Sequence, residues 1–493
     1  MRSSLNHRDL KKYENFSKKE LGVRLARLMR VAEAEDIPVL IIIDGFESSG
    51  KGYVINDLVE ELNPKYYDVD VFDRPSEEEN RYPFMTRFWR KIPRKGHTKV
   101  FDRSFYFEVM SNPTLSEKKT KKMVDGISSI ERVLYDDYTV IVKVFLEISQ
   151  EVQKETIDKY LHSKYNSFYV DKIDLDQNKN YDKYRKHIKY VLEESNFSFA
   201  PWNIIDSTNR KSASKDVLGL VIEELTKGIE RVATKREEGI RLKRNYIPLN
   251  RPIDHLDMKK SLSQEEYDKV YKDLQSQAAD ISYRMYSAGI PSIIVFEGVD
   301  AAGKDGAIKR LVKKMDPRLY TVHAISAPDE TENSYNYLWR FFTKIPEDGY
   351  MGIFSRSWYG RVMVERVEGF AQDNEWERAY DEILDMEKQF YDHGAFLLKF
   401  FVVIDKDTQL ERFESREEVP DKQYKITEED WRNRDKWDEY LDAMNEMLDR
   451  TDVEYAPWVL VEGNDKNYAR VKVLEKFIEY GTKRLEELEK EKK

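Results

Sequence analysis

The chain contains no cysteine, and this absence excludes disulfide bonds, thiolate metal sites and cysteine nucleophiles. It also lacks any run approaching the ~18 consecutive apolar residues of a membrane span, and its first residues do not resemble a signal peptide. A reducing compartment is the natural setting for a chain without cysteine. We therefore expect a cytoplasmic protein that does not enter a membrane.

Positive charge is not in excess either. The 83 Lys and Arg residues face 93 Asp and Glu residues, which gives a formal net charge of −10. Domains that bind nucleic acid are usually basic, so we do not expect a nucleic-acid partner. The cations can still gather locally around a polyanionic substrate.

The most informative stretch present is Gly-Val-Asp-Ala-Ala-Gly-Lys-Asp-Gly at 298–306, between an apolar run and a helical pattern. Its glycines let backbone N–H groups turn toward a phosphate, and the lysine and the helix N-terminus add positive charge. The usual motif ends in Ser or Thr, but Asp305 stands there; a plain strand-to-helix turn is the alternative. The phosphate-binding residues predicted from this loop are Gly298, Ala301, Ala302, Gly303, Lys304, Asp305 and Gly306.

The same loop occurs twice in the chain. Residues 45–52 match 298–305 without a gap at an offset of 253, and the offset becomes 256 where Ala-Pro-Trp at 200–202 corresponds to Ala-Pro-Trp at 456–458. A polar stretch with two prolines separates the copies and is typical of a linker. The sequence therefore predicts a duplicated domain, with domains at 1–235 and 263–493 and a linker at 236–262.

Apolar runs alternate with helical patterns in each half, which predicts a parallel sheet covered by helices on both faces. Before the first strand, four apolar residues recur at helical spacing and predict a helix that faces the core. These residues are Leu21, Leu25, Leu28 and Val31. The strands expected in the second half are 293–296, 320–325, 353–354, 396–404 and 459–461.

A second pattern follows each loop. An acidic residue at the end of a short apolar strand is where phosphoryl-transfer proteins hold Mg²⁺. The first half has Asp102 at this point, whereas the second half has Ser355. Arg103 and Arg356 come next, and arginine can hold a phosphate through two parallel hydrogen bonds.

Together with Pro-Asp-Glu-Thr-Glu at 328–332, Leu-Trp-Arg at 338–340 and Arg-Ser-Trp-Tyr-Gly-Arg at 356–361, the second loop resembles the family-2 polyphosphate kinases. The resemblance is strongest to their fused two-domain class, the polyphosphate:AMP phosphotransferases. It implies two tandem P-loop kinase-like domains of thymidylate-kinase-like α/β fold, with a helical lid. It also implies Mg²⁺-dependent transfer of a terminal phosphoryl group from inorganic polyphosphate to AMP, giving ADP.

The resemblance also implies roles for single residues. Lys304 would bind the phosphate chain, Asp300 would orient the acceptor or its metal, and Ser355 stands where the family has a metal-handling aspartate. We expect Asp300, with Glu297 or Asp305, to supply the missing negative charge. The implied catalytic residues are Asp300, Lys304, Arg356, Arg361 and Glu365, and the implied basic lid contributes Arg412, Arg416, Lys422 and Lys425.

The first half departs further from the family pattern. Asn112 and Pro113 replace the acid–arginine pair at 365–366, and Glu108 reverses the charge of Arg361. We interpret this half as non-catalytic, either holding polyphosphate weakly or filling the place of a dimer partner. Its degenerate site comprises Gly45, Glu47, Gly50, Lys51, Asp102 and Arg103.

Two other functions stay open at this point. One is a polyphosphate-dependent nucleoside diphosphate kinase that converts ADP to ATP. The other is a binding protein for polyphosphate or nucleotide in which both sites have lost activity. The sequence leaves open the direction of the reaction, the choice between AMP and GMP, the polyphosphate length and the oligomeric state.

Overall fold

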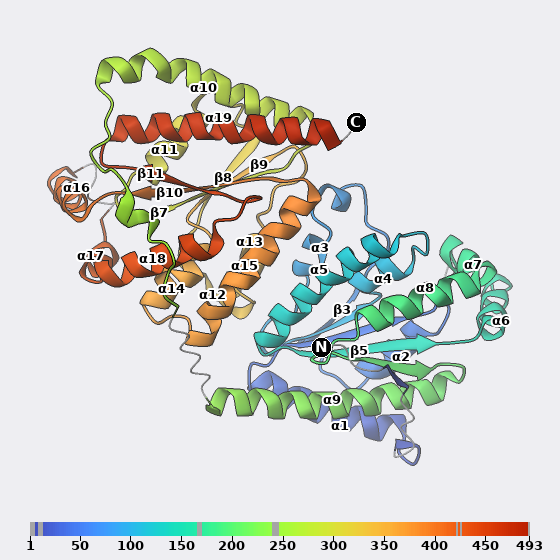
Figure 1. Ribbon diagram of the computed structural model, residues 1–493. Coiled ribbons are helices and arrows are strands. Elements are labelled where there is room, and N and C mark those ends of the chain that lie inside the picture. Colours follow the sequence, from blue (N-terminus) through green and yellow to red (C-terminus); the bar gives the residue numbers. More distant parts are fainter. Residues whose placement is uncertain are drawn as a thin grey trace. The chain divides into compact units, whose positions relative to one another are not determined.

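The computed structural model describes residues 5–7, 13–164, 170–238, 246–420, 423 and 426–491. Its chain divides into two compact units, each with its own sheet (Figure 1). Unit 1 comprises Met1–Glu79, Met85–Ile240 and Glu330–Trp339, and unit 2 comprises Asn80–Phe84, Arg241–Asp329 and Arg340–Lys493.

Unit 1 contains a parallel sheet with the strand order β1-β6-β5-β2-β4-β3. Helices α1, α2 and α9 cover one face, and α4, α5 and α8 cover the other (Figure 1). The strands of the first half are β1 Asn6–His7, β2 Val39–Gly45, β3 Tyr67–Val71, β4 Thr98–Asp102, β5 Val140–Glu147 and β6 Trp202–Asp206. Its helices are α1 Lys18–Ala34, α2 Lys51–Val59, α3 Thr86–Trp89, α4 Phe105–Met110, α5 Glu117–Asp136, α6 Gln150–Leu161, α7 Lys172–Lys179, α8 Tyr181–Glu194 and α9 Arg210–Glu238.

The second half confirms the predicted parallel sheet and all five of its expected strands. The strand order is β11-β10-β7-β9-β8, with α10, α11 and α19 on one face and α15 and α18 on the other (Figure 1). The strands are β7 Ser292–Gly298, β8 Tyr320–Ala324, β9 Met351–Ser355, β10 Phe396–Val403 and β11 Trp458–Glu462. The helices are α10 Gln264–Ser287, α11 Lys304–Leu311, α12 Glu330–Ser334, α13 Trp339–Phe342, α14 Val364–Val367, α15 Asp373–His393, α16 Lys406–Glu418, α17 Glu428–Asp435, α18 Trp437–Thr451 and α19 Lys466–Glu491.

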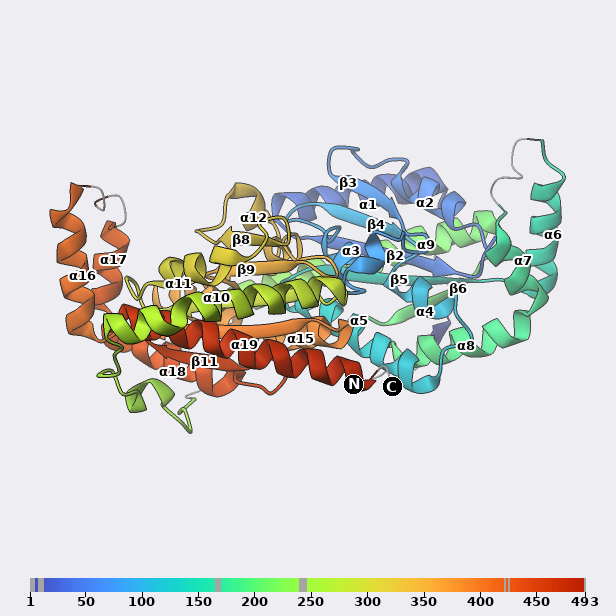
Figure 2. The same ribbon diagram turned by 90° about the horizontal axis from the view of Figure 1, so that it is seen from above.

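Helices α16 and α17 project together beyond the end of the unit 2 sheet (Figure 2). They follow β10, and α16 contains the basic stretch that the sequence placed in a lid. In unit 1, α6 and α7 follow β5 in the same way. The loop, the central strand and this helical pair therefore occur in the same order in both halves.

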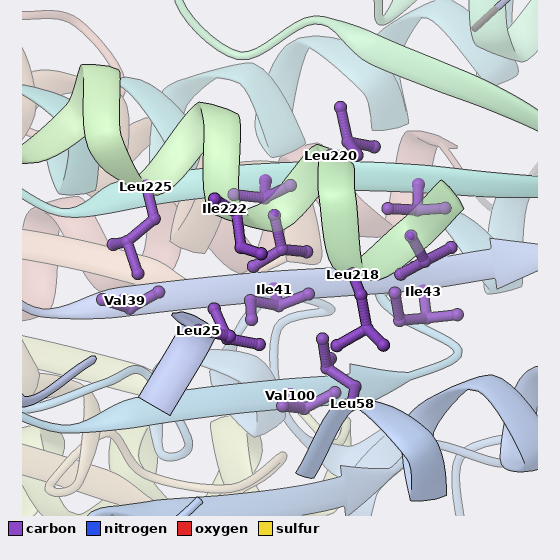
Figure 3. Close-up of a cluster of buried hydrophobic side chains, with 14 of the residues drawn as sticks. Leu25, Val39, Ile41, Ile43, Leu58, Val100, Leu218, Leu220, Ile222 and Leu225 are labelled. Atoms are coloured by element: carbon purple, nitrogen blue, oxygen red, sulfur yellow. The ribbon is translucent and has the colours of Figure 1, made fainter. Parts of the chain in front are cut away.

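The hydrophobic core of unit 1 explains why its central strands are apolar on both faces. Ile41 and Ile43 of β2 are fully buried beneath α9, whose Leu218 and Leu225 are also buried (Figure 3). Leu25 of α1 closes the same cluster. Burial on both faces is what parallel sheets require, and it positions the loop at the carboxyl end of β2.

The helical spacing was wrong about one residue of α1, because it predicted that Val31 faces the core. Helix α1 buries Leu21 and Leu25 completely, but Val31 is 44% exposed. Ala32 takes the inward position instead, with 2% exposure. An α-helix has 3.6 residues per turn. Ala32, four residues after Leu28, therefore stays on the inner face of the helix, whereas Val31, three residues after Leu28, lies off that face.

Both halves also contain the same buried ion pair. The Lys399 ammonium lies 2.8 Å from the Glu387 carboxylate, and the Lys143 ammonium lies 2.9 Å from that of Glu131. Each lysine also donates to a tyrosine hydroxyl, Tyr359 in one half and Tyr106 in the other. A buried charge needs such partners. The two halves therefore share this buried lysine–glutamate–tyrosine arrangement as well as the chain topology.

Candidate active site

The predicted phosphate-binding loop of unit 2 joins β7 to α11. Gly298 and Gly303 have φ values of +138° and +103°, in the region that favours glycine. A Cβ at Gly298 would lie 2.1 Å from the carbonyl oxygen of Val402 in β10, so only glycine allows this close approach. Among the described side chains none caps the first turn of α11, which leaves backbone N–H groups available to an anion.

Lys304 and Asp300 lie together at this loop. The Lys304 ammonium donates to the carbonyl oxygen of Gly298 at 2.6 Å, and desolvation lowers the pKa of Lys304 although Asp300 opposes this. Burial alone would raise the pKa of Asp300, but Lys304, Arg356 and the Asn433 amide outweigh it and hold that pKa below its ordinary value. The Arg356 guanidinium lies 3.3 Å from one Asp300 oxygen, and Asn433 donates to the other at 2.9 Å. Asp300 is therefore ionised next to two cations.

Ser355 ends β9, and its hydroxyl donates to Asp305 at 2.9 Å. The strand registers of the two halves agree here, because Ser355 pairs with Phe296 as Asp102 pairs with Ile43. At the offset of 253, Asp305 corresponds to Gly52. Each half thus carries one carboxylate at this pair of positions, on the strand in one half and on the helix in the other.

Glu297 is a weaker source of the missing charge. It is buried, accepts the Ser357 hydroxyl at 2.8 Å, and burial raises its pKa. Asp44 accepts the Ser104 hydroxyl in the same way in unit 1, and burial raises the pKa of Asp44 to about 6. The pair recurs in the first half, which indicates a structural role.

Arg361 and Glu365 are brought together with each other. They form an ion pair of 3.2 Å, and Arg361 also lies 3.9 Å from Glu375 of α15. Neither lines either of the two cavities that adjoin Lys304. Their predicted catalytic role therefore stays a prediction.

The side chain of Arg412 in α16 contacts the backbone of the loop. Its guanidinium donates to the carbonyl oxygens of Ala301 and Ala302 at 2.9 and 3.1 Å. It also donates to Gly463 and Asn464, which follow β11, at 2.7 and 2.9 Å. Arg412 thus ties the loop to the end of a neighbouring strand. The predicted lid residues Lys422 and Lys425 lie outside the described residues.

A basic cavity of about 810 Å³ opens beside the loop. It is lined by the loop residues 300–307 together with Ser355, and by side chains from α16, α17 and α19. Lys466 and Arg470 of α19 were not anticipated, because no motif marks them. Only the repeat could have drawn attention to Arg470, whose counterpart in the first half is Ser214. The cations that line the cavity are Lys304, Arg356, Arg412, Arg416, Lys466 and Arg470.

A second cavity of about 310 Å³ adjoins the first, and most of its wall is apolar. The two cavities share five lining residues, and three of these are charged residues of the loop site. The shared residues are Asp300, Lys304, Arg356, Glu429 and Asn433.

The first-half site has the same loop but different surroundings. Lys51 lies 3.4 Å from Glu47, and Arg103 pairs with both Glu47 and Asp73. At the offset of 256, the positions of Arg412, Arg416 and Arg470 are occupied by the uncharged residues Thr156, Tyr160 and Ser214. Lys51 and Arg103 are paired with acids, and Arg210, at the position of Lys466, donates to the Tyr160 hydroxyl, but the counterparts of Arg412, Arg416 and Arg470 carry no charge.

Within the described ranges, no group of three or more His, Cys, Asp or Glu side chains is arranged to hold a metal ion. In the same ranges, no helix has the length and apolar composition needed to cross a bilayer.

Comparison with known proteins gives a consistent result. The family model described as Polyphosphate kinase 2 (PPK2) matches residues 8–232 and 261–490. The chain is 40% identical over 450 residues to "Polyphosphate:AMP phosphotransferase" of Pseudomonas aeruginosa, covering 89% of each chain. It is 36% identical over 221 residues to "ADP-polyphosphate phosphotransferase 1" of Rhizobium meliloti, covering 45% of this chain and 74% of that one. A crystal structure of a polyphosphate kinase 2 from Pseudomonas aeruginosa matches with a TM-score of 0.83 and 36% identity, covering 98% of both chains.

Proposed function

Because this chain belongs to the polyphosphate kinase 2 family, we propose that it transfers the terminal phosphoryl group of inorganic polyphosphate to AMP, giving ADP. The observation that carries this proposal is the similarity over 89% of both chains to a protein named for polyphosphate and AMP. The relative named for ADP matches only 45% of this chain. The tandem arrangement therefore favours AMP over ADP as the acceptor.

The transfer needs little covalent chemistry from side chains. An oxygen of the AMP phosphate attacks the terminal phosphorus, a new P–O bond forms as the P–O–P bond breaks, and polyphosphate leaves one phosphate shorter. Catalysis then consists of positioning and of positive charge near the transferred group. Lys304 and Arg356 line both cavities at the loop, which supports this role for them.

Mg²⁺ fits the donor set at the loop. Mg²⁺ in kinases is usually held by one or two carboxylates, with substrate phosphates and waters completing its shell. Asp300 is kept ionised, and Asp305 is held by Ser355 beside the same cavity, so these two carboxylates would hold the ion. When bound, Mg²⁺ neutralises charge on the phosphate oxygens.

The first half, in this proposal, is not a catalytic site. The positions that correspond to Arg412, Arg416 and Arg470 carry the uncharged residues Thr156, Tyr160 and Ser214, so fewer cations are available there for a phosphate chain. We keep 236–262 as the linker between the proposed domains at 1–235 and 263–493.

The test is to incubate purified protein with AMP, Mg²⁺ and long-chain polyphosphate in the absence of ATP, and to follow ADP by chromatography. A parallel reaction starts from ADP. The Lys304→Ala variant, prepared identically, controls for contaminating kinases.

ADP formed from AMP by the parent protein but not by the variant supports the proposal. ATP formed only when ADP is supplied would assign the chain to the ADP-to-ATP reaction. Binding of polyphosphate or nucleotide without turnover would mean a protein that has lost catalysis.

A further inference from the structure

Near their starts, helices α5 and α8 of unit 1 carry a cluster of exposed cations that the proposed transfer does not use. The two helices pack against each other on one face of the sheet (Figure 1). We call the cluster the basic face, and each of its side chains is exposed to solvent. It consists of Lys118, Lys119, Lys121 and Lys122 of α5 and of Lys183, Arg185 and Lys186 of α8.

Both helices begin at the edge of the sheet where the first-half loop lies. Helix α5 leads into β5 and α8 leads into β6, and these strands are parallel to β2. The starts of the two helices therefore lie at the carboxyl ends of the strands. A cavity of about 650 Å³ is lined by residues 111–114, which precede α5, and by Asn180, Lys183 and Tyr184 at the start of α8. Arg74, which follows β3, adds a further cation to its wall.

The two acids that line this cavity oppose its cations only in part. Asp176 already accepts the Tyr184 hydroxyl at 2.7 Å and the Asn180 amide at 2.9 Å. Burial raises the pKa of Glu108 to about 7, so this carboxyl is partly protonated at neutral pH. The cations that border the cavity are therefore available to an anion.

The stability of the helices does not explain these cations. Lys118 and Lys119 lie in the first turn of α5, where the helix dipole disfavours positive charge. Lys118 also has Lys121 and Lys122 at helical spacings of three and four residues, and like charges at these spacings repel each other. A polyanion on the outer side of α5 would remove both penalties. The cluster is therefore better explained by a ligand than by folding.

The second half reverses the charge at the same positions. At the offset of 256, α5 corresponds to α15 and α8 to α18, and the buried lysine–glutamate pairs agree with this alignment for α5 and α15. Residues 117–125 and 181–186 hold seven cations and three acids, whereas residues 373–381 and 437–442 hold one cation and seven acids. The first turns of α15 and α18 are acidic, as the helix dipole favours. The basic face is therefore a feature of the first half alone.

We propose that the basic face of unit 1 binds a segment of long-chain polyphosphate that lies outside both glycine loops. The proposal rests on the proposed function for the identity of the polyanion, and it gives the first half a task in holding the donor substrate. A long polymer has segments beyond the one that reacts, and binding one of them keeps its end at a high effective concentration. Tripolyphosphate has no such segment, so its binding should not depend on the basic face. Nucleic acid is the less favoured polyanion, because the chain as a whole carries a net charge of −10.

The test is a calorimetric titration of the full chain with long-chain polyphosphate and with tripolyphosphate at several salt concentrations. The basic-face variant is Lys118→Gln/Lys121→Gln/Lys186→Gln. The matched control, Lys19→Gln/Arg27→Gln/Arg30→Gln, removes three exposed cations from α1, on the opposite face of the same sheet.

We expect the basic-face variant to bind long-chain polyphosphate at least about 10-fold more weakly than the parent, because fewer counterions are released on binding. For the same reason, its affinity should fall less steeply with salt. Its affinity for tripolyphosphate should equal that of the parent. The α1 variant should bind both ligands as the parent does.

Parent-like affinity of the basic-face variant for long-chain polyphosphate would overturn the proposal, as would an equal loss in the α1 variant. Loss of tripolyphosphate affinity in the basic-face variant would also contradict it. A single-stranded oligonucleotide is titrated in parallel. If it bound the parent more tightly than polyphosphate does, and lost that affinity in the basic-face variant, the face would be assigned to nucleic acid instead.

The outcomes also separate this proposal from the proposed function. If the basic-face variant loses long-chain affinity but the parent forms no ADP from AMP, the surface assignment stands and the proposed transfer fails. If the parent forms ADP and the basic-face variant binds long-chain polyphosphate as the parent does, the transfer stands and the surface assignment fails.

Discussion

Ser355 shows how a single departure from a family pattern can be matched within the same site. The resemblance leads one to expect a carboxylate at the end of β9, and the structure places one opposite it, on Asp305. In the first half the carboxylate is on the strand at Asp102, and Gly52 stands opposite. Since a Cβ at Gly52 would meet no atom within 4 Å, space is not what keeps that position small. Charge is the better explanation, because two facing carboxylates repel each other.

This arrangement predicts the result of restoring the family residue. Ser355→Asp alone should lower the rate of ADP formation about 10-fold, because repulsion keeps one of two adjacent carboxylates protonated. Asp305→Gly alone should also lower the rate, and the double variant Ser355→Asp/Asp305→Gly should recover most of it. Initial rates and Mn²⁺ affinity of the four proteins give the measurement. A gain on the order of 10²-fold in Ser355→Asp alone would mean that Asp305 does not compensate.

Glu108 is an acid at the position where the second half has Arg361. Burial raises its pKa from 4.5 to about 7, although Arg87 opposes this and Glu79 adds to it. The folded chain holds this proton to a higher pH than the unfolded chain does. Raising the pH from about 4.5 to about 7 therefore costs folding free energy in unit 1.

The variant Glu108→Gln, which cannot ionise, isolates this contribution. Its free energy of unfolding should match the parent at pH 5 and exceed it by about 2 kcal/mol at pH 8. Denaturant titrations of both proteins at the two pH values measure the difference in unfolding free energy. The contributions of all other carboxylates cancel, because the two proteins share them. An equal difference at both pH values would show that Glu108 does not titrate in this range.

At the scale of the element, α16 donates hydrogen bonds to the backbone of the loop and also lines the cavity beside it. Arg412 donates to carbonyl oxygens on two segments, whereas Arg416 lines the basic cavity one turn further on. We therefore expect the two arginines, which share a helix face, to differ in effect.

Replacing each arginine with alanine separates these roles. Arg412→Ala should lower stability by about 2 kcal/mol and reduce kcat, because four charge-assisted hydrogen bonds to backbone are lost. Arg416→Ala should mainly raise the KM for polyphosphate and leave the melting temperature unchanged. Thermal melts and steady-state kinetics of both variants distinguish the two effects. If Arg412→Ala changed only the KM for polyphosphate, its guanidinium would serve the phosphate directly.

Elements were easier to predict than contacts. The apolar β-branched runs and the glycine loop predicted the β7–loop–α11 unit, because burial and backbone geometry act locally on the chain. The resemblance placed Arg412 and Arg416 in one basic lid, but it does not say whether a backbone carbonyl or a ligand will be the partner of each. Arg470 lies far along the sequence from the loop, and only folding brings it to the cavity. Arg361 and Glu365 were predicted from the resemblance, which did not indicate that the two side chains form an ion pair with each other.

At the scale of the whole molecule, comparing equivalent residues of the two halves helps to distinguish those that the fold requires from those that the chemistry requires. The buried lysine–glutamate pair persists in both halves, as Lys143–Glu131 and as Lys399–Glu387. Around the loop, Lys304, Arg356 and Lys466 correspond to the cations Lys51, Arg103 and Arg210, whereas Arg412, Arg416 and Arg470 have uncharged counterparts. A charged residue present only in the second half is therefore a candidate for function, whereas a residue kept in both halves has to be judged by its surroundings.

The most direct test of the account compares the two loop lysines. Lys304→Ala and Lys51→Ala are assayed side by side for ADP formation from AMP, Mg²⁺ and polyphosphate, with circular dichroism to confirm folding. Lys304→Ala should lose activity by a factor on the order of 10³, while Lys51→Ala should stay within about 3-fold of the parent, a difference under 1 kcal/mol in transition-state stabilisation. Loss of turnover in Lys51→Ala with full activity in Lys304→Ala would contradict the assignment of catalysis to the second half.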